Sequence, residues 1–143
     1  MTAAFYWRDE FGVGHAEMDE THREFVDCVD AMLCAQDHQL AQALEAFSGH
    51  AERHFAEEDR AMRETAYGSA GCHIDEHVAV LKSVAEVRAA LTQGNHHVVR
   101  AFAQALVEWF PEHAQYMDLG LARWITQRRL GGAPVVIRSR ARA

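Results

Sequence analysis

Histidine and carboxylate residues recur at a spacing of four in two parts of the sequence. His54 and Glu58 form one such pair, and His73 and His77 form the other. Because an α-helix turns once every 3.6 residues, each pair lies on one helix face, where a single metal ion can contact both side chains. Helical bundles build metal sites in their cores from helices that each offer two donors in this way.

Three more candidate ligands lie outside these pairs. His22 lies upstream of them, and His113 and Asp118 lie downstream, where one further helix on each side could complete the same site. His113 and Asp118 are five residues apart, about 140° around an ideal α-helix, so this pair should straddle the inward face rather than stack on it. The set of five imidazoles and two carboxylates is too large for one ordinary ion and suits two.

The chemistry of this donor set favours some metals over others. Imidazoles mixed with carboxylates suit iron or manganese better than a metal that prefers thiolates. A single histidine on an apolar helix face is usually a hydrogen-bonded core residue. Burying all seven groups without a metal, however, would leave many polar atoms unpaired and two charges uncompensated. The sequence therefore predicts a buried metal site.

Long helices must position these residues, since only two prolines and nine glycines occur in 143 residues. Asp19 or Thr21 would lie near the start of the first helix as its N-cap. Pro111 lies inside the last helix and predicts a kink, or a junction of two helices, at that residue. Four amphipathic helices with short connections predict an all-α fold, an antiparallel up-down four-helix bundle over residues 19–130. The periodic apolar stripes predict helices at residues 19–37, 40–64, 70–91 and 96–129.

The two ends of the chain differ from this pattern. Residues 1–18 carry aromatic side chains from Phe5 to Phe11 without a helical period, which predicts an irregular aromatic arm that packs across the bundle. Residues 131–143 begin with two glycines and contain three arginines but no acidic residue, which predicts a flexible basic tail.

Charge and composition exclude several classes of protein. The formal net charge is −7, and residues 1–127 hold nine basic against 21 acidic residues, so the domain should repel nucleic acid. No apolar run has the length of a signal peptide or a membrane span. We therefore expect a cytoplasmic protein that binds neither nucleic acid nor membrane. The three cysteines lack a CxxC spacing and read as ordinary thiols in a reducing compartment: Cys28, Cys34 and Cys72.

The sequence resembles the hemerythrin family, specifically the single-domain bacteriohemerythrins, over residues 7–125. This resemblance implies a non-haem di-iron centre with an oxo or hydroxo bridge, which binds dioxygen reversibly as hydroperoxide for storage, transport or sensing rather than for catalysis. The matching motifs are MDETH ending at His22, HAERHFAEED from His50 to Asp59, HIDEH from His73 to His77, and HAQYMD from His113 to Asp118, after Trp109. It further implies three ligands for one iron (His73, His77 and His113), two for the other (His22 and His54), and two bridges (Glu58 and Asp118).

Several residues near these motifs allow two interpretations. Phe25, Phe55 and Trp109 are expected to line an apolar pocket for the bound oxygen, although a plain core role fits each of them equally well. His50 occupies a place where relatives often carry an aromatic residue. We interpret it as a partly exposed helix residue, with a hydrogen bond to a ligand as the alternative. Asp19 is expected to cap its helix rather than to hold the second nitrogen of His22.

Two other functions remain open from the sequence. One is a di-iron enzyme that reduces dioxygen, peroxide or nitric oxide, with turnover permitted by a wetter pocket around His50. The other is a module that holds iron or zinc without gas chemistry. We expect a monomer or weak oligomer, and a separate partner protein that receives a signal remains an open alternative.

Overall fold

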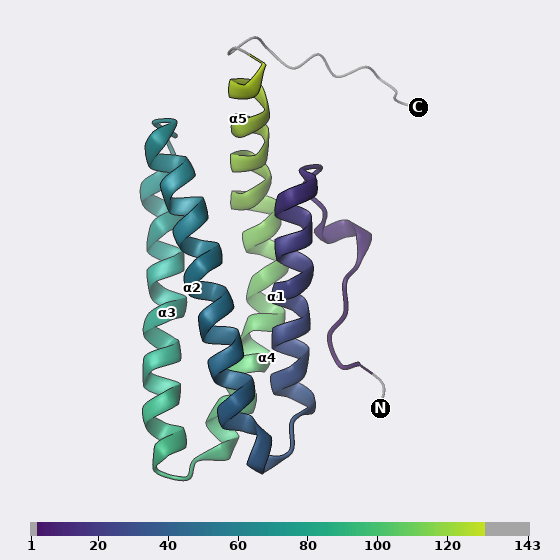
Figure 1. Cartoon of the computed structure of the whole chain (residues 1–143), viewed down its shortest axis with the longest axis vertical. Coiled ribbons are helices and arrows are strands. Elements are labelled where there is room, and N and C mark those ends of the chain that lie inside the picture. Colours follow the sequence, from purple (N-terminus) through teal and green to yellow (C-terminus); the bar gives the residue numbers. More distant parts are fainter. Residues whose placement is uncertain (1–2, 131–143) are drawn as a thin grey trace.

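The computed structural model describes residues 3–130, and this part of the chain contains helices and no strands. Successive long helices run in opposite directions and are joined by short connections at alternate ends (Figure 1). The predicted all-α four-helix bundle is therefore confirmed. Its long helices are α1 (Ala16–Cys34), α2 (Leu40–Glu64), α3 (Ala70–Thr92) and α4 (His96–His113), and α4 continues through the π-helical segment η3 (Ala114–Asp118) into α5 (Leu119–Arg129); the short 3-10 helices are η1 (Asp9–Phe11) and η2 (Asp37–Gln39).

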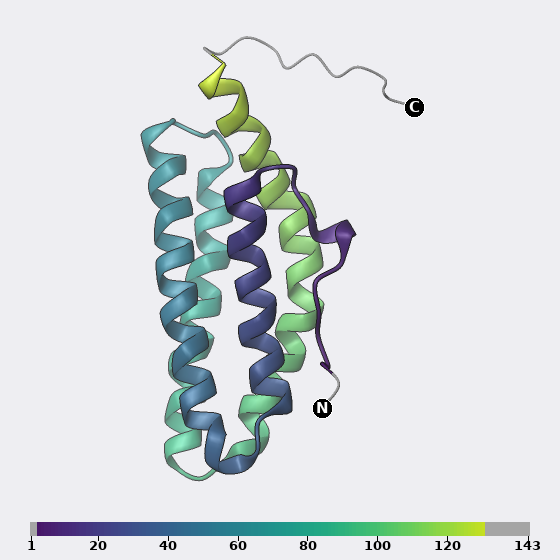
Figure 2. The same cartoon turned by 45° about the vertical axis from the view of Figure 1, so that its right-hand side comes forward.

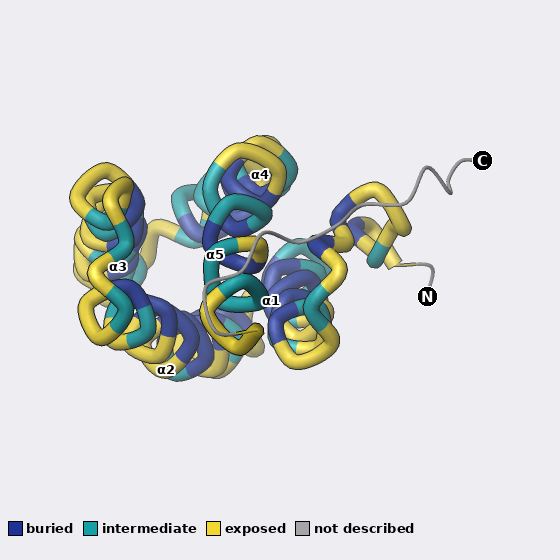
Figure 3. The backbone as a smooth tube through the Cα atoms, turned by 90° about the horizontal axis from the view of Figure 1, so that it is seen from above, coloured by how far each residue is buried: buried dark blue, intermediate teal, exposed yellow. Residues whose placement is uncertain are grey.

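The helices surround one core, with their buried faces turned toward each other (Figure 3). Helix α1 packs against α2 and α4, and α3 packs against the same two helices. Along α1, Met18 belongs to a small apolar cluster at one end of the bundle, while Phe25 belongs to the main apolar core. His22 lies between these two residues and is fully buried. The predicted polar site is thus enclosed between two apolar layers.

The first helix begins three residues earlier than predicted, at Ala16 rather than at residue 19. His15 is the N-cap, because its Nδ1 accepts a hydrogen bond from the backbone N–H of Met18 at 3.2 Å. The carboxylate of Asp19 instead accepts a hydrogen bond from the backbone of Val13 at 2.8 Å. The predicted cap at Asp19 was therefore wrong, since histidine is not among the usual capping residues that the prediction relied on.

The last long helix is irregular at residues 114–118 and not at Pro111, where the sequence predicted a kink. Helix α4 continues past Pro111 to His113, and the chain then forms one π-helical turn. In this turn the backbone N–H of Leu119 donates to the carbonyl of Ala114, an i→i+5 hydrogen bond. The α-helical pattern is therefore interrupted within η3, three residues beyond the proline, and not at Pro111.

Residues 3–15 run along the outside of α1 and α4 (Figure 2). The rings of Phe5 and Phe11 are buried and lie 6.4 Å and 5.3 Å from the ring of Phe110, measured between centroids. Tyr6 remains 61% exposed. None of the helices in the described residues is long and apolar enough to cross a membrane. The predicted basic tail, residues 131–143, lies outside the described residues.

Candidate metal centre

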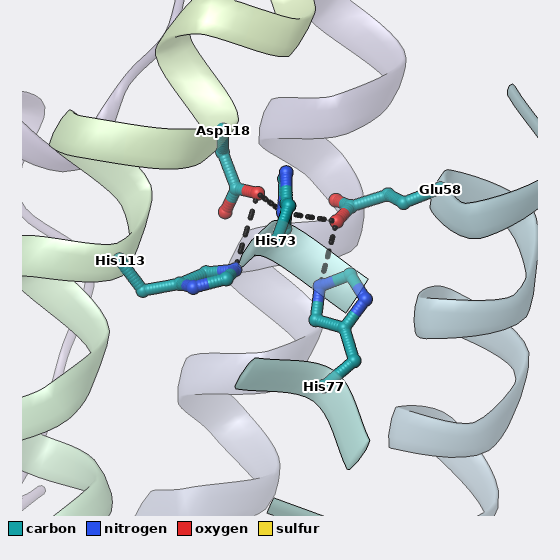
Figure 4. Close-up of side chains that lie close together, drawn as sticks. All are labelled: Glu58, His73, His77, His113 and Asp118. Atoms are coloured by element: carbon teal, nitrogen blue, oxygen red, sulfur yellow. Dashed lines mark ion pairs between the residues drawn. The ribbon is translucent and has the colours of Figure 1, made fainter. Parts of the chain in front are cut away.

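The seven side chains predicted to bind metal come together in one cluster between the four long helices. Figure 4 shows five of them: Glu58, His73, His77, His113 and Asp118. Each is at most 6% exposed. These side chains come from all four long helices and from η3. Both the spacing within each helix and the packing between helices are therefore needed to assemble the cluster. The cluster draws His22 from α1, His54 and Glu58 from α2, His73 and His77 from α3, His113 from α4 and Asp118 from η3.

The Glu58 carboxylate divides its two oxygens between two groups of histidines. Its Oε2 lies 2.8 Å from Nε2 of His54 and 3.4 Å from Nε2 of His22. Its Oε1 lies 3.2 Å from Nε2 of His77 and 3.4 Å from Nε2 of His73. Glu58 therefore presents a separate oxygen to each side of the cluster.

Asp118 repeats this division from the opposite side of the cluster. Its Oδ2 lies 3.2 Å from Nε2 of His22. Its Oδ1 lies 3.0 Å from Nε2 of His73 and 3.3 Å from Nε2 of His113. The two carboxylates thus define a histidine pair, His22 with His54, and a histidine trio. The trio consists of His73, His77 and His113.

The π-helical turn explains how His113 and Asp118 reach the same site. In an α-helix, residues five apart are separated by about 140°, as the sequence analysis assumed. In η3 the backbone hydrogen bonds connect residues five apart, so such residues lie nearly above one another. His113 and Asp118 therefore lie on the same face of the helix and do not straddle it as predicted. Nε2 of His113 lies 3.3 Å from Oδ1 of Asp118.

These residues fit a metal site by two structural criteria. Ligand atoms at about 2.1 Å from an octahedral ion lie about 3.0 Å apart when adjacent, and the contacts of 2.8–3.4 Å match that separation. In addition, several inward-facing atoms are buried and make no hydrogen bond, which would be costly if nothing bound them. These atoms include Nε2 of His22, His73, His77 and His113, Oε1 of Glu58, and both carboxylate oxygens of Asp118.

Two carboxylates that the sequence did not point to contact candidate ligand histidines from outside the cluster. Asp59 Oδ1 lies 2.7 Å from Nδ1 of His77, and Glu76 Oε1 lies 2.8 Å from Nδ1 of His113. Asp59 follows Glu58 and Glu76 precedes His77 in the sequence. Each nevertheless contacts a histidine on a neighbouring helix. A histidine that binds metal usually donates its second N–H to such a group. The signal in the sequence is therefore an acidic residue next to a candidate ligand.

In protein stripped of metal, the histidines and carboxylates compensate one another. Burial alone would lower the pKa of His22, but contacts with Asp118 and Glu58 outweigh it and raise the pKa from 6.5 to about 10. The same two carboxylates raise the pKa of His73 to about 9 against the effect of burial. Despite their own burial, both carboxylates have lowered pKa values because of the surrounding histidines. Metal uptake should therefore release protons.

These shifts predict how the stability of metal-stripped protein depends on pH. Unfolded histidine loses its proton near pH 6.5, whereas folded His22 and His73 retain theirs up to about 10 and 9, so stability falls as pH rises through this window. Glu58 and Asp118 have lowered pKa values, so stability also falls as pH drops below their ordinary values of 4.5 and 3.8. Thermal unfolding measured by circular dichroism between pH 4 and pH 10 tests this. Stability that increases from pH 6.5 to pH 9 would contradict it.

The three aromatic residues predicted to line a pocket for bound oxygen all lie against candidate ligands, but none of them lines the pocket of about 340 Å³ that reaches His54 and Glu58. Phe55 stacks on His77 with ring centroids 4.0 Å apart, and Trp109 stacks on His113 at 4.2 Å. Phe25 lies 6.2 Å from the His54 ring. Phe110 is also buried, and its ring lies 5.4 Å from that of His22. Aromatic rings therefore shield both the pair and the trio from the core side.

His50 is not the partly exposed residue that the sequence predicted, because it is only 7% exposed. Its ring lies 5.5 Å from that of His54, and its Nδ1 lies 3.7 Å from a carboxylate oxygen of Glu24 on α1. Burial, together with the nearby His54 and Arg53, lowers the pKa of His50 to about 4 and keeps its ring neutral. The α1–α2 packing decides this burial, which the helical period of α2 alone did not predict.

Cys72 is exposed although it is adjacent to His73, because consecutive helix residues point about 100° apart. Replacing Cys72 with Ser should leave the metal content of the protein unchanged. Metal analysis of the wild type and the variant, purified side by side, measures this. A loss of metal in Cys72→Ser would mean that thiolate ligation had to be considered again.

A pocket of about 340 Å³ connects one side of the cluster with the surface. Only His54 and Glu58 among the seven candidate ligands line it. Met18, Ala61 and residues of α5 form other parts of its wall. The histidine pair therefore has an open path toward solvent between α1, α2 and α5.

Comparison with known proteins agrees with this site. Residues 13–125 match the family described as the hemerythrin HHE cation binding domain. The chain is 34% identical over 122 residues to a bacteriohemerythrin of Ralstonia nicotianae, covering 85% of this chain and 89% of that protein. It is 23% identical over 124 residues to a bacteriohemerythrin of Stenotrophomonas maltophilia, covering 84% and 80% of the two chains. The match across the helices that carry the buried cluster shows that this chain belongs to the hemerythrin family.

Proposed function

We propose that this protein binds dioxygen reversibly, as hydroperoxide, at two iron ions joined by an oxo or hydroxo bridge. The observation that carries this proposal is the division of each carboxylate between the two histidine groups. Glu58 and Asp118 each direct one oxygen to the pair and the other to the trio, as carboxylates that bridge two ions must. The family and the names of both relatives support the same function.

The histidine trio would hold one iron, and the histidine pair, which the solvent-open pocket reaches, would hold the other. When bound, the two irons supply the electrons that the oxygen molecule takes up. The protein orients the ligands through Asp59 and Glu76, whose contacts place the Nδ1 protons outward and the Nε2 atoms inward. Phe25 and Phe110 exclude water from the core side of the pair, which favours release of the oxygen unchanged.

A deoxygenation cycle tests this proposal. The purified protein is reduced without air and exposed to oxygen, and its near-ultraviolet and visible charge-transfer bands are followed while oxygen is removed. Bands that form with oxygen, persist, and vanish on its removal are expected, with two irons counted per chain in the same sample. Bands that decay irreversibly to a ferric spectrum, or protein that holds no iron, would overturn the proposal.

The pocket beside His54 and Glu58 favours one alternative, a di-iron enzyme that reduces dioxygen, peroxide or nitric oxide. A pocket of about 340 Å³ that opens to solvent would admit water and small substrates to the histidine pair. The same cycle separates the two functions when an excess of reductant is present. Continuous consumption of oxygen beyond one molecule per di-iron centre would support the enzyme, and a single uptake would support the carrier.

A further inference from the structure

The five candidate histidine ligands differ in what their outward nitrogens contact. Among the described residues, Nδ1 of His77 contacts Asp59 and Nδ1 of His113 contacts Glu76, at 2.7 Å and 2.8 Å. The Nδ1 atoms of His22 and His54, and that of His73 within the trio, are by contrast buried and have no hydrogen-bond partner among the described residues. Two of the three histidines of the trio therefore contact an outer carboxylate, and neither histidine of the pair does.

An outer carboxylate changes how well a histidine binds metal. It holds the Nδ1 proton, so that the free electron pair of Nε2 faces the ion, and it makes the imidazole more basic. The side chain of Asp59 is 17% exposed, so its interaction with His77 is only partly screened by water. The trio should consequently bind a divalent ion more tightly than its number of imidazoles alone implies.

The histidine pair is also more accessible to solvent than the histidine trio. The pocket of about 340 Å³ reaches His54, a member of the pair, and Glu58. On the other side, Phe55 and Trp109 stack on His77 and His113 and cover the trio. A smaller pocket of about 160 Å³ borders His113, but Glu76, which takes the outward Nδ1 of that histidine, also lines it.

We propose that the two metal positions are unequal: the histidine trio, held by Asp59 and Glu76, fills first and retains its ion, while the histidine pair fills second and exchanges its ion through the pocket beside His54. This inference rests on the proposed ligand set but not on oxygen binding. A form with one ion per chain is then a defined intermediate of loading.

Titration of metal-stripped protein with Co²⁺ under anaerobic conditions tests the order of filling. Calorimetry and the visible d–d absorption of Co²⁺ should resolve two binding steps of different affinity. Asp59→Ala and Glu76→Ala should each weaken the first step by about 10- to 100-fold, the usual effect of losing such an outer contact, and change the second step much less. Weakening of the second step alone, or a single step in the wild type with both ions released at one rate, would overturn the proposal.

Matched controls separate this effect from general damage to the helices. Asp75→Ala alters an exposed carboxylate next to Glu76, for which no contact with the cluster is found, and should leave both steps unchanged. Asp59→Asn keeps an oxygen acceptor without the charge and should recover part of the lost affinity. Circular dichroism confirms that each variant is folded before titration. Equal losses in Asp75→Ala and Glu76→Ala would count against the proposal.

The exchange path has its own test. Ala61 lines the pocket, so Ala61→Phe should slow the extraction of the second Co²⁺ by a chelator and leave the retained ion unaffected. Ala56→Phe, on an exposed face of the same helix, is the control and should not change the rate. Unchanged extraction in Ala61→Phe would overturn the assigned path. Two Co²⁺ steps without an oxygen cycle in the iron-loaded protein would refute the proposed function alone. No binding of Co²⁺ would refute the inference drawn here, and the iron count and the oxygen cycle then decide the proposed function.

Discussion

Glu58→Ala should reduce the iron content from two ions per chain to one or none. Glu58 contacts four of the five candidate histidines through its two oxygens, more than any other ligand in the cluster. The substitution therefore removes a donor from both positions, together with one of the two charges that compensate the ions. Iron analysis and the charge-transfer spectrum of purified variant and wild type measure the effect.

The neighbouring residue supplies the control for this experiment. Glu57 precedes Glu58 on α2 but is exposed, so Glu57→Ala changes the same charge without touching the ligands. Its iron content should equal that of the wild type. Two irons and an unchanged spectrum in Glu58→Ala would defeat the assignment of this carboxylate as a bridge.

Phe110→Ala should destabilise the protein by about 3–5 kcal/mol, the usual cost of removing a buried phenyl ring. Phe110 is 1% exposed, and its ring contacts those of Phe11 and His22 at 5.3 Å and 5.4 Å. It also stacks on Phe25 at 5.0 Å. The cavity would loosen residues 3–15 and let water approach the histidine pair, so oxidation of the oxygenated protein should accelerate as well.

Chemical denaturation gives the loss of stability, and decay of the oxygenated spectrum gives the rate of oxidation. Tyr116→Ala is the control, because this ring is 79% exposed and its removal should change stability by no more than about 0.5 kcal/mol. Phe110→Leu keeps most of the side-chain volume, so its loss of stability should lie between those of Phe110→Ala and Tyr116→Ala. A loss below about 1 kcal/mol in Phe110→Ala would show that the ring is not essential to the core.

The sequence predicted the features that depend on local periodicity. The i,i+4 spacing placed His54 with Glu58 and His73 with His77 on single helix faces, because helix geometry is set by neighbouring residues. Apolar stripes gave the number and approximate bounds of the long helices, including residues 40–64 without error. Hydrophobic burial of those stripes leaves few arrangements other than an antiparallel bundle, so the fold class followed too.

Features that depend on contacts between helices required the tertiary structure. The π-helical turn moved Asp118 onto the face of His113, although the sequence favoured an irregularity at Pro111. Packing of α1 against α2 buries His50, which the sequence analysis had predicted to be partly exposed. Asp59 and Glu76 contact histidines on neighbouring helices, which spacing along their own helices did not predict. Spacing along one helix defines which residues share a face, but only the packing of helices decides which faces meet and which side chains remain in reach of solvent.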